Sequence, residues 1–132
     1  MTRPQSGIAT DCAHSEKKKK TEFRGVDLST GEILFYEDIG YQTVNIGEYL
    51  GVVSAIKYII EKNYDCKTVY TDSLTAINWF NNKKAFSKKQ YTPLLKAEIF
   101  QKALASKISE IEVVHWNNSQ WGEIPADFGN KK

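Results

Sequence analysis

The stretch NIGEYLGVVSAIKYIIEKNYDCKTVYTDS (residues 45–73) joins a long helical pattern to a short strand. Between Asn45 and Asn63, apolar residues recur at the spacing of one helix face, namely Ile46, Tyr49, Leu50, Val53, Ile56 and Ile60. Lys67–Thr71 then has the pattern of a strand, which ends at Asp72 and Ser73. A helix followed closely by a strand is typical of layered α/β proteins.

The segments on either side extend this pattern. Before the helix we expect three strands, of which the second and third form a hairpin, at Gly7–Ala13, Thr21–Asp27 and Ile33–Ile39. After residue 73 we expect a short helix at Leu74–Asn81 and a fifth strand at Ile111–Trp116. Between these two, Thr92 as cap and Pro93 at the first position start another helix. Its predicted apolar face carries Leu95, Ile99, Ala103, Leu104 and Ile108. This order predicts an α/β fold, a mixed sheet with helices packed on it.

Length and composition favour one soluble domain. The chain has 132 residues, of which 41% are hydrophobic and 26% charged. We interpret residues 1–6 as a tail and residues 7–132 as a single domain. No apolar run approaches the roughly 20 residues that span a bilayer, and the polar start lacks the apolar core of a signal peptide. We therefore expect a cytoplasmic protein. Two cysteines, Cys12 and Cys66, form neither a disulfide framework nor a zinc-ligand set.

The positive charge is clustered, although the net charge is only +2. One run covers residues 17–20, and a second comprises Lys83, Lys84, Lys88 and Lys89. Clustered lysines can bind phosphate backbones by charge. The alternative is a solvated loop, and the composition alone does not decide between the two.

Four acidic residues stand at positions where surface charge is not expected. Asp11 lies inside the first predicted strand among small and apolar residues, so its carboxylate needs a partner or a cation. Asp72 ends the fourth strand, Glu48 lies in the first turn of the long helix, and Asp127 follows the fifth strand. Glu48 could instead close a capping box with Asn45, Asp72 could cap the next helix, and Asp127 could be a surface acid.

Carboxylates from separate elements can converge on hard cations such as Mg²⁺. Two such ions can activate a water and stabilise the leaving oxygen of a phosphodiester. Taken residue by residue, the pattern therefore indicates a metal-dependent phosphoryl-transfer site as one interpretation, with the structural roles above as the other.

Four stretches occur in the order and on the elements found in type I ribonuclease H, and the chain resembles that family over about residues 7–130. It is most similar to the compact bacterial form of Bacteroides-like organisms. The stretches are Thr10-Asp11 with Phe23-Arg24-Gly25, residues 45–49 (NIGEY), residues 70–73 (YTDS), and residues 121–129 (WGEIPADFG).

The resemblance implies a ribonuclease H-like α/β fold, a five-stranded mixed sheet with helices on both faces. It also implies an endonuclease that hydrolyses the RNA strand of RNA–DNA hybrids with two Mg²⁺ ions, or Mn²⁺ in their place. Asp11, Glu48, Asp72 and Asp127 would be the catalytic, metal-binding carboxylates. Asn45 would contact the 2′-hydroxyl side of the hybrid and Thr43 a DNA-strand phosphate. From its charge alone, we expect the second lysine run also to bind substrate. We expect a monomer.

Three features depart from the family. A glycine-rich turn is replaced by His14-Ser15-Glu16 and four lysines, and no histidine lies between Trp116 and Asp127. His115 is expected to lie on the fifth strand as a structural residue. Few residues follow Asp127, so the closing helix is nearly absent. These departures keep open a second hypothesis, a non-catalytic module that binds hybrid or RNA.

Overall fold

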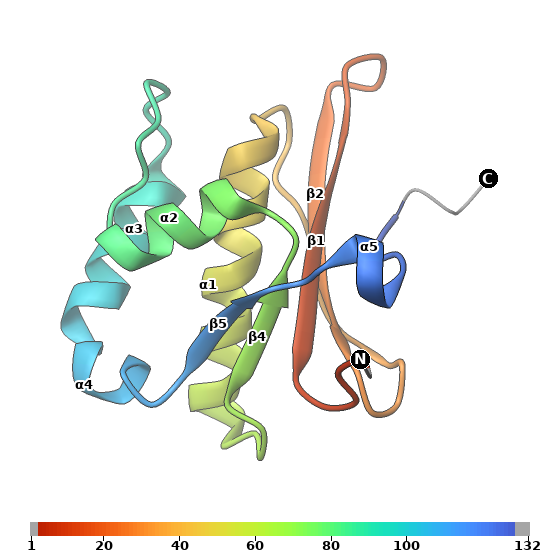
Figure 1. Ribbon diagram of the computed structural model, residues 1–132. Helices are drawn as coiled ribbons and strands as arrows, with labels where there is room; N and C mark the ends of the chain where they lie inside the picture. The colour runs from red at the N-terminus through yellow and green to blue at the C-terminus, as the bar shows by residue number, and fades with distance from the viewer. Residues whose placement is uncertain (1–2, 129–132) are drawn as a thin grey trace.

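The computed structural model describes residues 3–128, so the ends of the predicted tail and domain (residues 1–2 and 129–132) lie outside the described chain. A five-stranded sheet runs through the molecule in the order β3-β2-β1-β4-β5 (Figure 1). The strands are β1 (Ile8–Ser15), β2 (Lys20–Asp27), β3 (Ile33–Asp38), β4 (Thr68–Thr71) and β5 (Glu112–His115). β1, β2 and β3 pair antiparallel, whereas β4 runs parallel to both β1 and β5. The predicted mixed sheet is confirmed.

Helices lie on both faces of the sheet, but unequally (Figure 1). One face carries the four helices α1 (Val44–Lys62), α2 (Leu74–Asn82), α3 (Thr92–Ala103) and α4 (Ala105–Ile108). The other face carries α5 (Asn118–Trp121), a single turn within the segment that follows β5. No helix within residues 3–128 has both the length and the apolar character needed to cross a membrane.

The core is divided by the sheet because neighbouring residues of a strand point to opposite faces. Ile8 and Val69 are fully buried in the cluster formed with α1. Ala9, next in β1, belongs instead to a cluster on the other face with Trp116, Ile124 and Ala126. The Trp116 indole Nε1 donates to the carbonyl oxygen of Gly122 at 2.8 Å. This hydrogen bond satisfies the buried indole N–H and holds the segment after β5 against the sheet.

The predicted face of α3 is wrong. Leu95 and Ile99 are 58% and 57% exposed, and the helix buries Leu94, Ala97 and Gln101 instead. A glutamine can be buried here because its amide is satisfied: Tyr49 Oη donates to Gln101 Oε1 at 2.5 Å, and Gln101 Nε2 donates to the Phe80 carbonyl at 3.0 Å.

The predicted cap of α3 is also wrong, because Tyr91 takes the N-cap position and Thr92 is already the first helical residue. Pro93 does lie in the first turn, as expected, where its missing N–H is not needed. Of the other residues assigned to this face, Ala103 is exposed, Leu104 is half-buried and Ile108 is buried.

Candidate active site

Three carboxylates meet where the parallel strands β1 and β4 separate. The register pairs Ile8 with Val69 and Ala9 with Tyr70, which places Asp11 and Asp72 at equivalent positions two residues further on. β4 ends at Thr71, whereas β1 continues to Ser15 paired with β2. Glu48 reaches the same point from the first turns of α1. One ligand oxygen from each of Asp11, Glu48 and Asp72 lies within 4.8 Å of the others.

Close packing of α1 on β1 brings Glu48 to this cluster. Thr43 caps the helix, since its Oγ1 accepts a hydrogen bond from the Ile46 N–H at 3.2 Å. The alternative in which Asn45 is the cap and Glu48 closes a capping box is therefore wrong. Glu48 is 8% exposed, and its Oε1 has no hydrogen-bond partner among the described residues. A buried oxygen without a partner is one that a cation would satisfy.

A glycine makes this approach possible. A Cβ added at Gly47 would collide with Cys12 Sγ and lie 3.0 Å from Thr21 Cγ2. We expect Gly47→Ala to destabilise the protein by about 1–3 kcal/mol, as overpacking a tight contact does, and to lower activity by displacing Glu48. Cys12→Ala in the same chain should restore part of both losses, which urea unfolding and an activity assay of the two single variants and the double variant would measure. Purely additive losses would contradict this account.

The acids of this cluster lie close together without a positively charged side chain paired to them. Burial, and next the charge of Asp72, raises the pKa of Asp11 from 3.8 to about 7. Burial, and next the charge of Asp11, raises the pKa of Glu48 from 4.5 to about 9. The ion pairs found over residues 3–128 are His14–Glu16 and Lys20–Glu22, neither of which involves these acids. Hard oxygen donors without a side-chain cation fit a divalent metal ion.

Asp127 joins the cluster from the opposite face of the sheet. Arg24 on β2 holds the backbone there, since its Nε donates to the Ala126 carbonyl and its Nη2 to the Asp127 carbonyl, each at 2.9 Å. The Asp127 carboxyl lies beside that of Asp11 and helps to raise its pKa, although less than burial and Asp72 do. Asp127 is therefore placed next to Asp11, whereas the group with ligand oxygens within 4.8 Å of one another comprises Asp11, Glu48 and Asp72.

Three further residues support the acids, and their roles could not be predicted from the sequence. Arg24 is one. Asn118 Nδ2 donates to Asp72 Oδ2 at 3.0 Å and so orients that carboxylate. Glu123 is exposed, hydrogen-bonds Asp127, and has its pKa raised chiefly by the Asp127 charge. Arg24 and Glu123 stand inside the family-like stretches, which was the available signal, but spacing alone does not show what they contact.

The structural alternative for Asp72 is also wrong, because Ser73 caps α2. Its Oγ accepts a hydrogen bond from the Ala76 N–H at 3.0 Å. Asp72 is thus free of a capping role and directed to the cluster and Asn118.

His115 ends β5, as expected, and lies outside the acid cluster. Cys12 and Cys66 are both free and half-buried, and burial raises the Cys12 pKa.

The two lysine runs lie at the same end of the molecule as the start of α1 (Figure 1). Lys89 Nζ donates to the Tyr41 carbonyl at 2.8 Å, and Lys19 Nζ lies 4.9 Å from the centre of the Tyr41 ring. Tyr41 precedes Thr43 by two residues, so both runs flank the expected phosphate contact. Lys83, Lys84 and Lys88 are exposed in the segment joining α2 and α3. The turn without glycine is accommodated by Lys19, whose φ is 53°.

No family model matches this chain. Solved structures do match it. LC11-RNase H1, isolated from compost, is 18% identical with a TM-score of 0.59, covering 91% of this chain and 88% of that one. The RNase H1 of the halophilic archaeon Halobacterium salinarum is 15% identical with a TM-score of 0.55, covering 89% of each chain. LC11-RNase H1 in complex with an RNA/DNA hybrid is 19% identical with a TM-score of 0.51, covering 86% of each. The chain has the ribonuclease H fold.

Proposed function

We propose that this protein is a metal-dependent endonuclease of the type I ribonuclease H family, which cuts the RNA strand of RNA–DNA hybrids. One observation carries the proposal: the buried Asp11 and Glu48 meet the half-buried Asp72, with Asp127 beside them, at the point where β1 and β4 separate in a ribonuclease H fold. The substrate is supported by the similar LC11-RNase H1, which has been solved with an RNA/DNA hybrid.

In this proposal two divalent cations, Mg²⁺ or alternatively Mn²⁺, would be held by Asp11, Glu48, Asp72 and Asp127. Bound cations would lower the pKa of a water and balance charge on the leaving oxygen. Asp11 and Glu48 must lose their protons to act as ligands. Asn118 holds Asp72 in place, and Arg24 fixes the backbone of Asp127. Glu123 is the exposed acid beside the cluster, so it offers a path by which protons leave for solvent.

Substrate recognition would lie along the start of α1 and the two lysine runs. Asn45 is exposed on the first turn of α1, where it can meet the RNA 2′-hydroxyl that distinguishes RNA from DNA. Thr43 is exposed two residues earlier, beside Tyr41 and Lys89, where a phosphate of the DNA strand would be attracted. Lys83, Lys84, Lys88 and Lys89 extend the positive surface along the duplex.

A labelled hybrid tests the activity directly. With Mg²⁺ or Mn²⁺ we expect internal cuts in the RNA strand, leaving 5′-phosphate and 3′-hydroxyl ends, and no cleavage in chelator. Duplex DNA of the same sequence should remain intact. If duplex DNA is cut as readily as hybrid, the ribonuclease H assignment is wrong. Hybrid binding without cleavage under either metal would instead support the non-catalytic module.

The lysine run has its own test. Changing Lys83, Lys84, Lys88 and Lys89 together to alanine should raise KM and flatten its salt dependence, by roughly 0.9 in the logarithmic slope for each phosphate that the variant no longer binds. The matched control changes four exposed lysines outside this segment, Lys62, Lys67, Lys102 and Lys107, which lie at the end of α1, before β4, at the end of α3 and in α4. The same effect in both quadruple variants would show that net charge, and not this segment, is responsible.

A further inference from the structure

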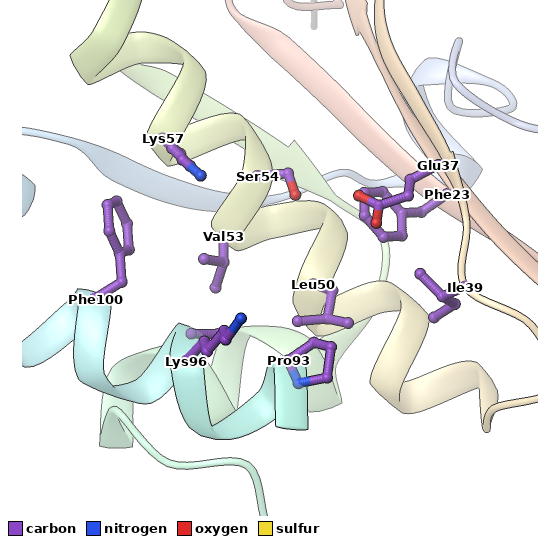
Figure 2. A pocket seen from close by; sticks show the side chains of 11 residues that line it. Phe23, Glu37, Ile39, Leu50, Val53, Ser54, Lys57, Pro93, Lys96 and Phe100 are labelled. Carbon is purple, nitrogen blue, oxygen red and sulfur yellow. The ribbon is translucent and has the colours of Figure 1, made fainter. Parts of the chain in front are cut away.

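A cavity lies on the helical face, away from the carboxylates. It has a volume of about 310 Å³ and opens between α1, α3 and the strands β2 and β3 (Figure 2). Figure 2 shows Leu50 and Val53 of α1 and Phe100 of α3 around it, with Phe23 and Ile39 at the sheet side. The proposed nuclease reaction makes no use of this space.

The walls of the cavity belong to the main apolar core. Phe23, Ile39, Leu50, Val53 and Ala97 are all buried members of one core cluster, and Phe100 packs against it. The space is open to solvent on one side, so it is a groove over the core and not an internal void. Its volume sits at the lower end of the roughly 300–1,000 Å³ that ligand pockets span. Its apolar floor suits a small apolar group.

The rim adds charge to this apolar space. Lys57 on α1 and Lys96 on α3 line it, and Figure 2 shows their amine ends turned toward the gap between the two helices. Neither lysine has an ion-pair or hydrogen-bond partner within residues 3–128. Glu37 and Ser54 complete the rim. Two ammonium groups against one carboxylate leave a net positive rim above an apolar floor.

We propose that this cavity binds a small amphipathic anion, a medium-chain carboxylate such as octanoate. The alkyl chain would fill the space among Leu50, Val53 and Phe100, where burial of apolar surface favours binding. The carboxylate would lie between Lys57 and Lys96, which are the groups without partners at the rim. A neutral ligand of the same shape would gain only the burial of its apolar surface, and a cationic ligand would be repelled by Lys57 and Lys96.

Calorimetric titration of the whole chain with octanoate, octanol and octylamine tests the proposal without relying on nuclease activity. We expect octanoate to bind about tenfold more tightly than octanol, since two partly exposed ion pairs contribute modestly, and octylamine to bind most weakly. Lys57→Gln with Lys96→Gln should reduce octanoate affinity to that of octanol and leave octanol unchanged. The control, Lys62→Gln with Lys102→Gln on the same two helices, should have no effect.

A second variant tests the location. Ala97→Leu places a larger side chain in the cavity and should abolish binding of octanoate and octanol while circular dichroism shows an intact fold. If that variant does not fold, Ser54→Leu blocks the space from α1. Absence of octanoate binding to the unmodified protein, equal affinity for octanoate and octanol, or unchanged binding in the filled variant would each overturn the proposal. So would an equal loss of affinity in the Lys62/Lys102 control.

Discussion

Asp72→Asn is expected to lower cleavage of an RNA–DNA hybrid by more than about 100-fold while leaving the fold intact, since even residues that only support metal ligands cost about 10- to 100-fold. The substitution removes one charge and little else. Asn118 can still donate to the remaining side-chain oxygen, and the cap of α2 is Ser73, which is untouched. A loss of activity without a loss of structure would therefore report the charge. Near-normal cleavage would remove Asp72 from the metal-binding set.

The companion variant Asp11→Asn separates catalysis from stability. Asp11 is 7% exposed and faces Asp72 and Asp127. Replacing it should abolish cleavage and yet raise the melting temperature of the metal-free protein, because repulsion and the desolvation of a carboxylate are both relieved. Mg²⁺ should raise the melting temperature of the unmodified protein by mass action and that of either variant less. Asp65→Asn, an exposed acid outside the cluster, is the matched control and should behave like the unmodified protein.

The second large effect is a loss of stability with rising pH in the absence of metal. In the folded protein the pKa values of Asp11 and Glu48 are raised to about 7 and about 9. The unfolded chain releases those protons near pH 4, so between these limits the folded state holds more protons than the unfolded state. The free energy of unfolding should then fall as pH rises, by ~1.4 kcal/mol per pH unit for each proton of difference.

Urea unfolding in chelator, from about pH 5 to about pH 9, measures this slope. Mg²⁺ should flatten it, because cations replace the protons that the cluster otherwise needs. Glu48→Gln should flatten it without metal, since the buried group can no longer ionise. A slope that is the same in the unmodified protein and in Glu48→Gln would assign the pH dependence to groups elsewhere.

The sequence predicts the sheet and most helices correctly because their signals are local. The apolar spacing of residues 45–63 and the strand pattern before Asp72 depend on neighbours in the chain, and α1 and β4 follow within a residue or two. Asp11 is also recognisable, because a carboxylate among small apolar residues of a strand needs a partner wherever the strand lies. Its identification as part of a cluster rested on the resemblance to ribonuclease H.

What the sequence could not show depends on contacts between distant segments. Leu95 and Ile99 have the spacing of a buried face. The hydrogen bonds of the Gln101 amide to Tyr49 and to the Phe80 carbonyl instead favour burial of the face of α3 that carries Gln101. Asn45 is as good a cap as Thr43 by composition, and only the path of the chain into α1 decides between them. Glu123 looks like any exposed acid until Arg24, about 100 residues earlier, brings Asp127 to the cluster.

The early end of β4 has a further consequence, for self-association. From Thr10 to Ser15, β1 pairs with β2 but has no strand on its other side among the described residues. An unpaired strand edge is a place where a second chain can add by backbone pairing. Here Asp11 and Asp72 stand at the start of that edge, and an incoming strand would have to displace solvent and counterions from them. We therefore expect the acids proposed for catalysis also to disfavour such pairing, so that variants in which they are neutralised should aggregate more readily than the unmodified protein.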